Sequence, residues 1–377
     1  MAEPSHHDRP WLDPDADAFI HVQGVTKKFG SFIAVNNVDI KIYRGELFAL
    51  LGGSGCGKTT LLRVLAGFEQ PTEGRVVIDG VDMTDLPSYE RPTNMMFQSY
   101  ALFPHMNVEN NVAYGLKRDG VPKPEIAERV SAMLELVQLT PFAKRKPHQL
   151  SGGQRQRVAL ARSLIKQPKV LLLDEPLGAL DKKLREQTQF ELMNIQDQLG
   201  ITFIVVTHDQ EEAMTLSTRI AVMNEGEIAQ VGEPTEIYEK PQTRFTADFI
   251  GTVNLFEGRV EESAAGPVVR CEDVPQPLHV EANGDLKAGA DVCVAIRPEK
   301  IALSKDAPPD NGANQMHGQV QDLAYMGNLS IYRVKLDGGR IVQITTPNQR
   351  RLSERDINWD DDVTVSWQPA DAIVLTQ

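Results

Sequence analysis

A glycine-rich turn between two regular elements constrains the fold of this 377-residue chain more than any other feature. The turn follows the apolar, strand-length run Glu46–Leu51 and precedes a helical pattern over Thr60–Ala66. It matches the pattern G-x-x-x-x-G-K-[ST] and consists of Gly52, Gly53, Ser54, Gly55, Cys56, Gly57, Lys58 and Thr59. Glycines let backbone N–H groups converge on phosphate oxygens, and the following helix adds its positive N-terminal end. The strand, the turn and the helix together predict a nucleotide-binding P-loop.

The residues that close the turn indicate a nucleotide with β and γ phosphates, together with Mg²⁺, as the ligands. Lys58 can reach the β and γ phosphate oxygens, and the hydroxyl of Thr59 can bind Mg²⁺. Thr60, at the start of the predicted helix, completes the expected nucleotide contacts. The alternative, an ordinary glycine-rich turn, does not account for the strand and the helix on either side.

Two further apolar runs deliver polar residues at their C-terminal ends. Val170–Leu173 is followed by Asp174 and Glu175, and Thr202–Val206 is followed two residues later by His208. Open α/β sheets bind ligands at this edge of their strands. We expect Asp174 to bind Mg²⁺ and Glu175 to act as the general base that polarises the attacking water. The imidazole of His208 can donate a hydrogen bond to the γ-phosphate.

Composition narrows the possible partners and the compartment. The net charge of −13 argues against nucleic acid or an anionic lipid surface as the main partner. The three cysteines (Cys56, Cys271 and Cys293) lack metal-ligand spacing and fit a reducing compartment. No stretch approaches the ~20 apolar residues that span a bilayer, and residues 1–17 resemble a disordered tail rather than an export signal. We therefore expect a cytosolic protein that reaches a membrane only through another protein.

Three regions differ in their pattern of apolar residues. In residues 18–250, short apolar runs alternate with helical stretches, which predicts an α/β domain with a largely parallel sheet. Within it, residues 89–150 are a predicted helical insertion with an amphipathic helix over Glu125–Val137. Residues 251–377 are predicted to form a small antiparallel β domain, because short alternating segments recur there. These segments are Leu255–Val260, Val292–Ile296, Gly318–Leu323, Ile331–Leu336, Val363–Trp367 and Ala372–Leu375.

A pentapeptide downstream of the P-loop links the chain to a family. Its residues, Leu150, Ser151, Gly152, Gly153 and Gln154, resemble the signature peptide of ATP-binding-cassette (ABC) ATPases. Ser151 can cap the helix that follows, and the glycines leave the helix N-terminus open to an anion. Alone, the peptide could be only a serine-capped helix. Together with the P-loop, the resemblance implies an α/β P-loop NTPase core of the ABC type with a helical subdomain.

The same resemblance implies roles for residues that chemistry alone leaves open. Gln98 falls on the Q-loop glutamine, which contacts Mg²⁺ or the attacking water, and His208 falls on the switch histidine. Gly178–Asp181 resembles the D-loop, which crosses the dimer interface, and Asp181 is its acidic residue. Phe29 falls on the aromatic residue that stacks against adenine, with simple core packing as the alternative.

One P-loop and one signature peptide per chain imply that two chains cooperate. In this family each ATP lies between the P-loop of one subunit and the signature peptide of the other, so a homodimer closes on two ATP and opens after hydrolysis. Two transmembrane permease subunits are the implied partners, with a substrate-binding protein acting indirectly and no nucleic acid. The apolar segment Gln98–Met106 is the expected permease-docking region, unless it packs within the helical insertion. The resemblance thus implies a peripheral protein on the cytoplasmic face of the plasma membrane.

The C-terminal region resembles the oligonucleotide/oligosaccharide-binding-like (TOBE-type) extension of importer ATPases. Ala295–Glu299 carries this resemblance. Within that group the chain most resembles the ATPases of bacterial putrescine importers, in four stretches: Asn94–His105, Ala143–His148, Phe249–Gly258 and Leu323–Ser330. Another solute, such as a sugar or iron, is the first alternative. A DNA-repair ABC ATPase is the second, but those proteins carry a long coiled-coil insertion that this chain lacks.

Overall fold

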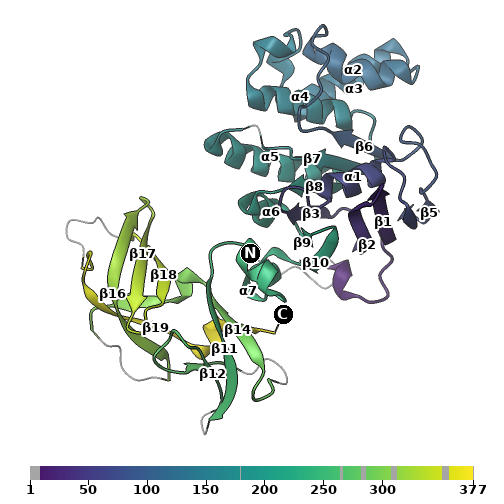
Figure 1. The fold of residues 1–377 in the computed structure, drawn as a ribbon. Helices are drawn as coiled ribbons and strands as arrows, with labels where there is room; N and C mark the ends of the chain where they lie inside the picture. The colour runs from purple at the N-terminus through teal and green to yellow at the C-terminus, as the bar shows by residue number, and fades with distance from the viewer. Residues whose placement is uncertain are drawn as a thin grey trace. The chain divides into compact units, whose positions relative to one another are not determined.

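The computed structural model describes residues 9–178, 180–263, 266–281, 286–306, 312–349 and 356–376. They form two compact units, one ending at Thr235 and the other beginning at Glu236 (Figure 1). Residues 1–8 of the predicted tail lie outside the described residues. The rest of that segment includes a 3-10 turn, Pro10–Leu12, and the indole N–H of Trp11 donates to Glu233 Oε1 over 3.1 Å. This part of the predicted tail is therefore attached to the first unit.

A six-stranded sheet forms the centre of the first unit. Its strands, in spatial order, are β10 (Glu227–Gly232), β9 (Arg219–Asn224), β3 (Leu47–Gly52), β8 (Thr202–Thr207), β7 (Val170–Asp174) and β6 (Thr93–Met96). All neighbours pair in parallel except β9 and β10. Every residue of β3, β7 and β8 is buried, as the apolar runs predict for strands covered on both faces. The predicted parallel sheet is confirmed.

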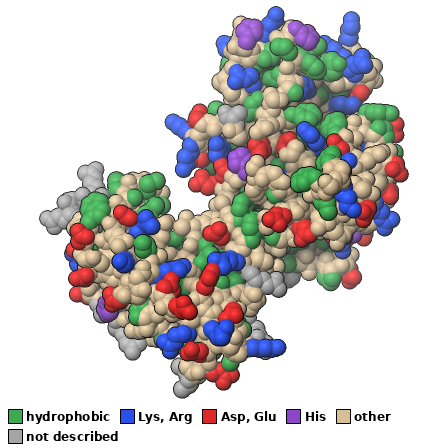
Figure 2. All heavy atoms as spheres, in the orientation of Figure 1, with side chains coloured by type: hydrophobic (Ala, Val, Ile, Leu, Met, Phe, Trp, Pro, Cys, Tyr) green, Lys and Arg blue, Asp and Glu red, His purple; other side chains and the backbone are tan. Residues whose placement is uncertain are grey.

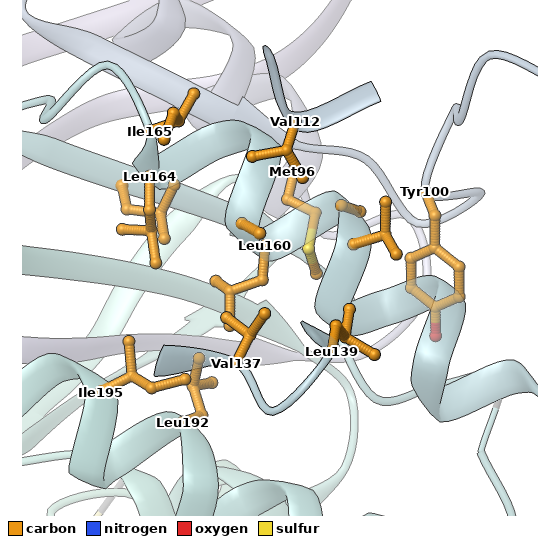
Figure 3. Close-up of a cluster of buried hydrophobic side chains, with 14 of the residues drawn as sticks. Met96, Tyr100, Val112, Val137, Leu139, Leu160, Leu164, Ile165, Leu192 and Ile195 are labelled. Carbon is orange, nitrogen blue, oxygen red and sulfur yellow. The ribbon is translucent and has the colours of Figure 1, made fainter. Parts of the chain in front are cut away.

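Helices cover this sheet and form a separate layer beyond it (Figure 1). Their bounds are α1 (Lys58–Ala66), α2 (Val108–Arg118), α3 (Lys123–Leu136), α4 (Gly152–Leu164), α5 (Lys182–Leu199) and α6 (Gln210–Leu216), with 3-10 turns at Thr140–Phe142 and Pro147–Gln149. The buried positions of α3 are Ile126, Val130 and Leu134, which confirms the predicted amphipathic helix. Figure 3 shows how Met96 of β6 packs with the helices in one apolar cluster.

A second, antiparallel sheet in the first unit was not predicted. Its order is β2 (Phe32–Ile42), β1 (Ile20–Phe29), β4 (Glu73–Ile78) and β5 (Val81–Asp82). Ile20 and Val38 of this sheet share an apolar cluster with Leu61 of α1 and Val206 of the parallel sheet. Helix α1 therefore packs between the two sheets, and the glycine-rich turn that precedes it is held there as well.

The second unit is built from two five-stranded antiparallel sheets. One is ordered β13 (Leu278–His279), β12 (Gly266–Arg270), β11 (Asn254–Ser263), β14 (Asp291–Ile296) and β20 (Ala372–Leu375). The other is ordered β15 (Ala302–Ser304), β19 (Asp362–Trp367), β16 (Asn314–Tyr325), β17 (Leu329–Leu336) and β18 (Ile341–Pro347). All six predicted segments are strands, and the rings of Phe256 and Trp367 stack at 5.9 Å in the core between them. The predicted antiparallel β domain is confirmed.

Buried Arg297 explains why the second unit begins before residue 251, where the sequence placed the boundary. Helices α7 (Pro234–Glu239) and α8 (Arg244–Phe249) precede β11. The guanidinium of Arg297 is 3% exposed and donates to the carbonyl oxygens of Ala247, Gly251, Thr252 and Tyr238. It also lies 4.3 Å from the centre of the Tyr238 ring. Arg297 therefore ties this segment to the β domain, together with the hydrogen bond from Tyr238 to Glu299 and the contact of Ala247 with Cys293 and Ala295.

The surface is mixed in charge. On the face seen in Figure 2, acidic and basic side chains interleave, with hydrophobic side chains among them. Among the helices of the described residues, none is both long and apolar enough to cross a membrane.

Replacing Arg297 tests its role as an anchor. Arg297→Ala leaves several carbonyl oxygens without a charged donor, so we expect the free energy of unfolding of the second unit to fall by about 2–4 kcal/mol. Arg333→Ala is the matched control, because Arg333 forms only an exposed ion pair with Asp322, 3.3 Å apart, and should change stability by less than ~1 kcal/mol. Chemical denaturation of both variants measures the difference. Equal losses would show that Arg297 anchors nothing.

Candidate functional site

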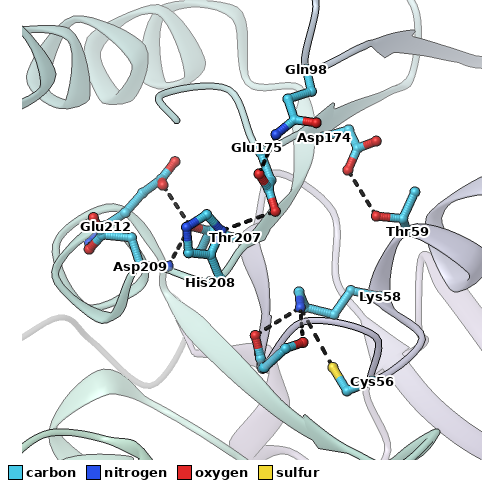
Figure 4. Close-up of polar contacts among 12 residues, drawn as sticks. Cys56, Lys58, Thr59, Gln98, Asp174, Glu175, Thr207, His208, Asp209 and Glu212 are labelled. Atoms are coloured by element: carbon cyan, nitrogen blue, oxygen red, sulfur yellow. Dashed lines mark hydrogen bonds and ion pairs between the residues drawn. The ribbon is translucent and has the colours of Figure 1, made fainter. Parts of the chain in front are cut away.

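The glycine-rich turn between β3 and α1 surrounds a buried lysine. Lys58, the first residue of α1, is 6% exposed. Its Nζ donates to the carbonyl oxygens of Gly52 at 2.8 Å and Gly53 at 2.7 Å, and lies 3.6 Å from Cys56 Sγ (Figure 4). No carboxylate of the described residues comes within ion-pair distance, 4.0 Å, of this ammonium group. Its charge is therefore available to an anion.

The glycines divide the turn into a packed side and an open side. At Gly57 the backbone is left-handed, with φ +103°, and a Cβ would clash with the carbonyl oxygen of Ala34. A Cβ on Gly52 would meet Cys56 Sγ at 2.6 Å. By contrast, nothing lies within 4 Å of a Cβ built on Gly53 or Gly55. Close packing on one side and free space on the other fit a loop that admits phosphate.

The three hydroxyl residues of the predicted loop differ in exposure. Ser54 is exposed at the tip and Thr60 is half-buried in the first turn of α1. Thr59 is also half-buried, and its Oγ1 donates to Oδ1 of Asp174 over 3.2 Å.

The hydroxyl of Thr59 and the carboxyl of Asp174 provide hard oxygen ligands. Asp174 ends β7 and is 9% exposed. Burial raises the pKa of its carboxyl, while the hydrogen bond from Thr59 opposes the increase. A divalent cation would remove this burial penalty, and hydroxyl and carboxylate oxygens suit Mg²⁺. The pair thus fits the predicted metal.

Gln98 contacts the predicted base in this structure, and its contact with Mg²⁺ or the attacking water stays a prediction. Its Nε2 donates to Oε2 of Glu175 over 2.6 Å. The amide nitrogen of Gln98 therefore holds the predicted base. No group of three or more His, Cys, Asp or Glu residues in the described chain is arranged to hold a metal.

Glu175 is held between two side chains from neighbouring segments (Figure 4). Gln98 engages one carboxylate oxygen, and Nδ1 of His208 lies 3.0 Å from the other, Oε1. The backbone of Glu175 has φ +46°, and Tyr100 and Ala101 next to Gln98 are also left-handed, with φ +61° and +43°. Such conformations cost roughly 1–3 kcal/mol each and gather at functional sites. The arrangement can orient a water molecule and accept its proton.

The signature peptide begins helix α4. Ser151 is the exposed N-cap, and its Oγ accepts the N–H of Gln154 over 3.3 Å. Oε1 of Gln154 in turn accepts the N–H of Ser151 over 3.0 Å, which completes a capping box. The S-x-x-Q pattern could have predicted this second bond. Gly152 and Gly153 form the first turn, where a Cβ on Gly153 would press on Leu184 at 3.0 Å.

Asp181 and Phe29 lie outside the hydrogen-bonded group around Glu175. Asp181 caps α5 by accepting the N–H of Leu184 over 3.0 Å, and Ala179 of the predicted D-loop lies outside the described residues. Phe29 ends β1 with 46% of its surface exposed, and Lys27 Nζ lies 4.9 Å from the ring centre. Its exposure excludes simple core packing.

One buried acid beside the site, Glu212, was not predicted. Glu212 of α6 is 2% exposed, and its Oε2 accepts the hydroxyl of Thr207, over 2.6 Å, next to His208. Burial raises the pKa of Glu212 to about 7. Asp209 caps α6 and Glu212 stands three residues later, so the D-x-x-E pattern could have drawn attention to it.

Three features together define the class of this protein. They are the phosphate loop at the edge of a parallel sheet, the pair of Thr59 and Asp174, and Glu175 held by His208 and Gln98. The chain is an α/β P-loop nucleotide-binding protein with the residues needed for nucleotide hydrolysis.

Comparison with known sequences identifies the family. Residues 35–178 match the ABC transporter family, and residues 294–375 match the TOBE domain. The putrescine transport ATP-binding protein PotG of Escherichia coli K12 is 54% identical over 358 residues, which cover 95% of each chain. The spermidine/putrescine import ATP-binding protein PotA of Rubrobacter xylanophilus is 50% identical over 359 residues, covering 94% of this chain and 93% of that protein. The chain belongs to the family of ABC transporter ATP-binding proteins.

Solved structures support the same fold. A dimeric ATP-binding cassette in a post-hydrolysis state, bound to ADP and Pi, matches 57% of this chain and 98% of its own with 34% identity and a TM-score of 0.52. CbiO1 of Clostridium perfringens, part of the ABC transporter complex cbiONQ, matches 59% of this chain and 90% of its own with 31% identity and a TM-score of 0.55. The predicted ABC ATPase core and TOBE-type domain are confirmed.

The packing of Gly57 gives a test of the loop. In Gly57→Ala the methyl group must displace the Ala34 carbonyl, so we expect the turn to shift and ATP affinity to fall by about tenfold or more. Gly80→Ala is the matched control, because Gly80 has φ +76° but nothing within 4 Å of a built Cβ. It also places alanine at a positive φ, but without the clash. Calorimetric titration with ATP compares the two, and equal affinities would contradict the packing argument.

Proposed function

We propose that this chain is the ATP-binding and ATP-hydrolysing subunit of an ABC importer for putrescine or a closely related polyamine. The observation that carries the ATPase assignment is the position of Glu175 between Gln98 and His208, at the same sheet edge as Lys58 and Asp174. The relatives PotG and PotA, named for putrescine and spermidine transport, support the cargo.

In the proposed mechanism the loop binds the triphosphate. Lys58 and the backbone N–H groups of the turn bind the β and γ phosphate oxygens. Thr59 and Asp174 would hold Mg²⁺, which supplies positive charge that offsets the phosphate charge. Phe29, exposed at the end of β1, offers its ring face to adenine. Phosphoryl transfer needs little covalent help, so this positioning supplies much of the catalysis.

The hydrolytic step belongs to Glu175 and its two neighbours. Glu175 orients the attacking water and accepts its proton as the water oxygen meets the γ-phosphorus. When both ring nitrogens of His208 carry protons, Nδ1–H donates to Glu175 and Nε2–H can donate to the γ-phosphate. The amide of Gln98 holds the second carboxylate oxygen. The base and the phosphate contact are thus fixed relative to each other.

A second copy of the chain completes the site in this proposal. Ser151 is exposed at the N-terminus of α4, where free backbone N–H groups favour an anion. We infer that Ser151, Gly152 and Gly153 of one chain cover the γ-phosphate bound by the other, with Asp181 at the interface. Gln154 acts by fixing this cap. The dimeric, post-hydrolysis cassette bound to ADP and Pi supports the arrangement.

The segment after Gln98 provides a connection toward the permease. Arg162 of α4 donates to the carbonyl oxygens of Tyr100 and Ala101, and Asn111 of α2 bonds both the N–H and the carbonyl of Phe103. A shift of Gln98 is therefore transmitted to the helical layer.

We propose that a helix of the permease docks on that layer. A cavity of about 640 Å³ opens there, lined by apolar side chains such as Ala113 and Ile126 together with Lys117 and Glu109. Within the segment Gln98–Met106, Tyr100, which is 6% exposed, and the partly buried Leu102 pack internally. A substrate-binding protein would act on the permease and not on this chain, and the chain would lie at the cytoplasmic face of the membrane.

Cargo uptake tests the proposed transporter. Cells lacking this subunit should regain uptake of radiolabelled putrescine when the wild-type chain is restored, and should not regain it with Glu175→Gln at equal expression. Spermidine and a sugar are measured in parallel arms. Restored sugar uptake with no change in putrescine would favour an importer for another solute.

Glu175→Gln also tests the dimer. Removal of the general base should slow hydrolysis by roughly 10²- to 10⁴-fold while ATP still binds, so the closed dimer should accumulate. Size-exclusion chromatography with ATP measures this. Ser151→Arg in the same background should keep ATP binding but elute as a monomer, because it blocks the contact across the interface. A monomeric Glu175→Gln protein, or loss of ATP binding in Ser151→Arg, would contradict the shared site.

A further inference from the structure

A closed ring of hydrogen bonds fixes the backbone on both sides of His208 (Figure 4). The hydroxyl of Thr207 accepts the N–H of Asp209 over 3.0 Å and donates to Oε2 of Glu212 over 2.6 Å. Oδ1 of Asp209 accepts the N–H of Glu212 over 3.1 Å. The side chain of His208 itself points out of this ring, 59% exposed, toward Glu175. The ring therefore determines where the imidazole lies.

Glu212 is the buried member of the ring. Its Oε1 has no hydrogen-bond partner among the described residues, and burial raises the pKa of its carboxyl to about 7. The hydrogen bond from Thr207 opposes this increase, as do Arg185 and His208, whereas Asp209 adds to it. Glu212 also contributes to the raised pKa of Tyr100, whose main cause is burial. Around neutral pH the carboxyl is therefore partly protonated.

Arg185 ties the ring to another element. Its Nη1 donates to Oδ2 of Asp209, and its Nη2 donates to the carbonyl oxygen of Leu180 over 3.3 Å. Leu180 immediately precedes Asp181, the N-cap of α5. The position of His208 is thus linked to the start of α5 through side chains that do not touch Glu175.

We propose that Glu212 is a positioning residue for ATP hydrolysis, whose buried carboxyl holds Thr207 and Asp209 so that the imidazole of His208 meets Glu175. The inference rests on the proposed role of His208. A neutral carboxyl accepts the Thr207 hydroxyl without burying a charge. Ionisation strengthens the hydrogen bond from Thr207 but places a charge in a buried setting beside Asp209. Because burial is the larger influence on this carboxyl, ionisation favours an opened start of α6 and a displaced imidazole. Turnover should therefore fall as pH rises through the pKa of Glu212.

Substitutions at Glu212 distinguish the effect of its hydrogen bond with Thr207 from the effect of its ionisation. In the full-length protein assembled with its permease, Glu212→Ala should lower kcat by about tenfold or more and change KM for ATP by less than about threefold. Glu212→Gln keeps the acceptor for Thr207 but cannot ionise, so it should retain near-wild-type kcat at neutral pH. The kcat of the wild type should fall as pH rises through about 7, and the kcat of Glu212→Gln should not show this fall. Glu211→Gln, exposed on the same helix, is the matched control and should follow the wild type.

A second pair of variants keeps the proposal testable if Glu212→Ala does not fold. Thr207→Ser preserves the hydroxyl and should retain kcat, whereas Thr207→Val removes it and should lower kcat as Glu212→Ala does. Thermal melting identifies any variant that is merely unstable. A Glu212→Gln profile that declines with the wild type, or full kcat in Thr207→Val, would overturn the inference.

His208→Ala distinguishes this inference from the proposed mechanism. If His208→Ala retains turnover, the proposed role of the histidine fails. If it abolishes turnover while the Glu212 and Thr207 variants behave as wild type, only the positioning role fails. With both correct, the double variant of Glu212 and His208 should be no slower than His208→Ala alone, because the two residues act through one contact.

Discussion

In-register pairing of three parallel strands is the constraint on which this site depends. Leu51 of β3 pairs with Thr207 of β8, and Val206 of β8 pairs with Asp174 of β7, so the three strands end at the same level. The N–H of Glu175 then bonds the carbonyl of Val206 over 2.9 Å, one residue beyond the end of β7. Because both faces of these strands are buried, a slip in register would force apolar side chains to repack against both covering layers. The register therefore fixes the phosphate loop, the carboxylates and the histidine relative to one another.

The surroundings of the glycine-rich turn limit what it can accept. Helix α1 lies between the parallel and the antiparallel sheet, and Ala34 of β2 presses on Gly57. The turn is rigid on this side and free beside Gly53 and Gly55. By contrast, Glu175 and two residues shortly after Gln98, Tyr100 and Ala101, have left-handed backbone conformations. The binding loop is thus preorganised, and the segments that report on hydrolysis hold less favoured backbone conformations.

Local patterns in the sequence predicted the chemistry well and the assembly of the sheets less well. The P-loop, Asp174–Glu175 and Ser151 each follow from residues close together in the chain, and the fully apolar runs of β3, β7 and β8 mark buried strands. The antiparallel sheet of the first unit was missed because β1 and β2 contain half-buried and exposed positions that break a simple alternation.

Contacts between residues far apart in the chain account for the features that could not be predicted from the sequence. The start of the second unit depends on Arg297, which reaches back 50 residues to Ala247. The burial of Glu212 depends on the fold around α6 and not on its neighbours in the chain. The polyamine cargo rests on similarity to relatives, because none of the residues described in this site recognises an amine cargo.

The choice of serine as the N-cap of α4 has a consequence for binding. Ser151 uses a lone pair of Oγ to accept the N–H of Gln154, so its hydrogen remains free to point outward. Aspartate would close the helix equally well, but its carboxylate would repel a triphosphate and could donate nothing to it. Asparagine would cap without charge, yet with a bulkier planar group. The serine hydroxyl therefore ends the helix with one lone pair and offers its proton to an anion in the smallest group that can do both.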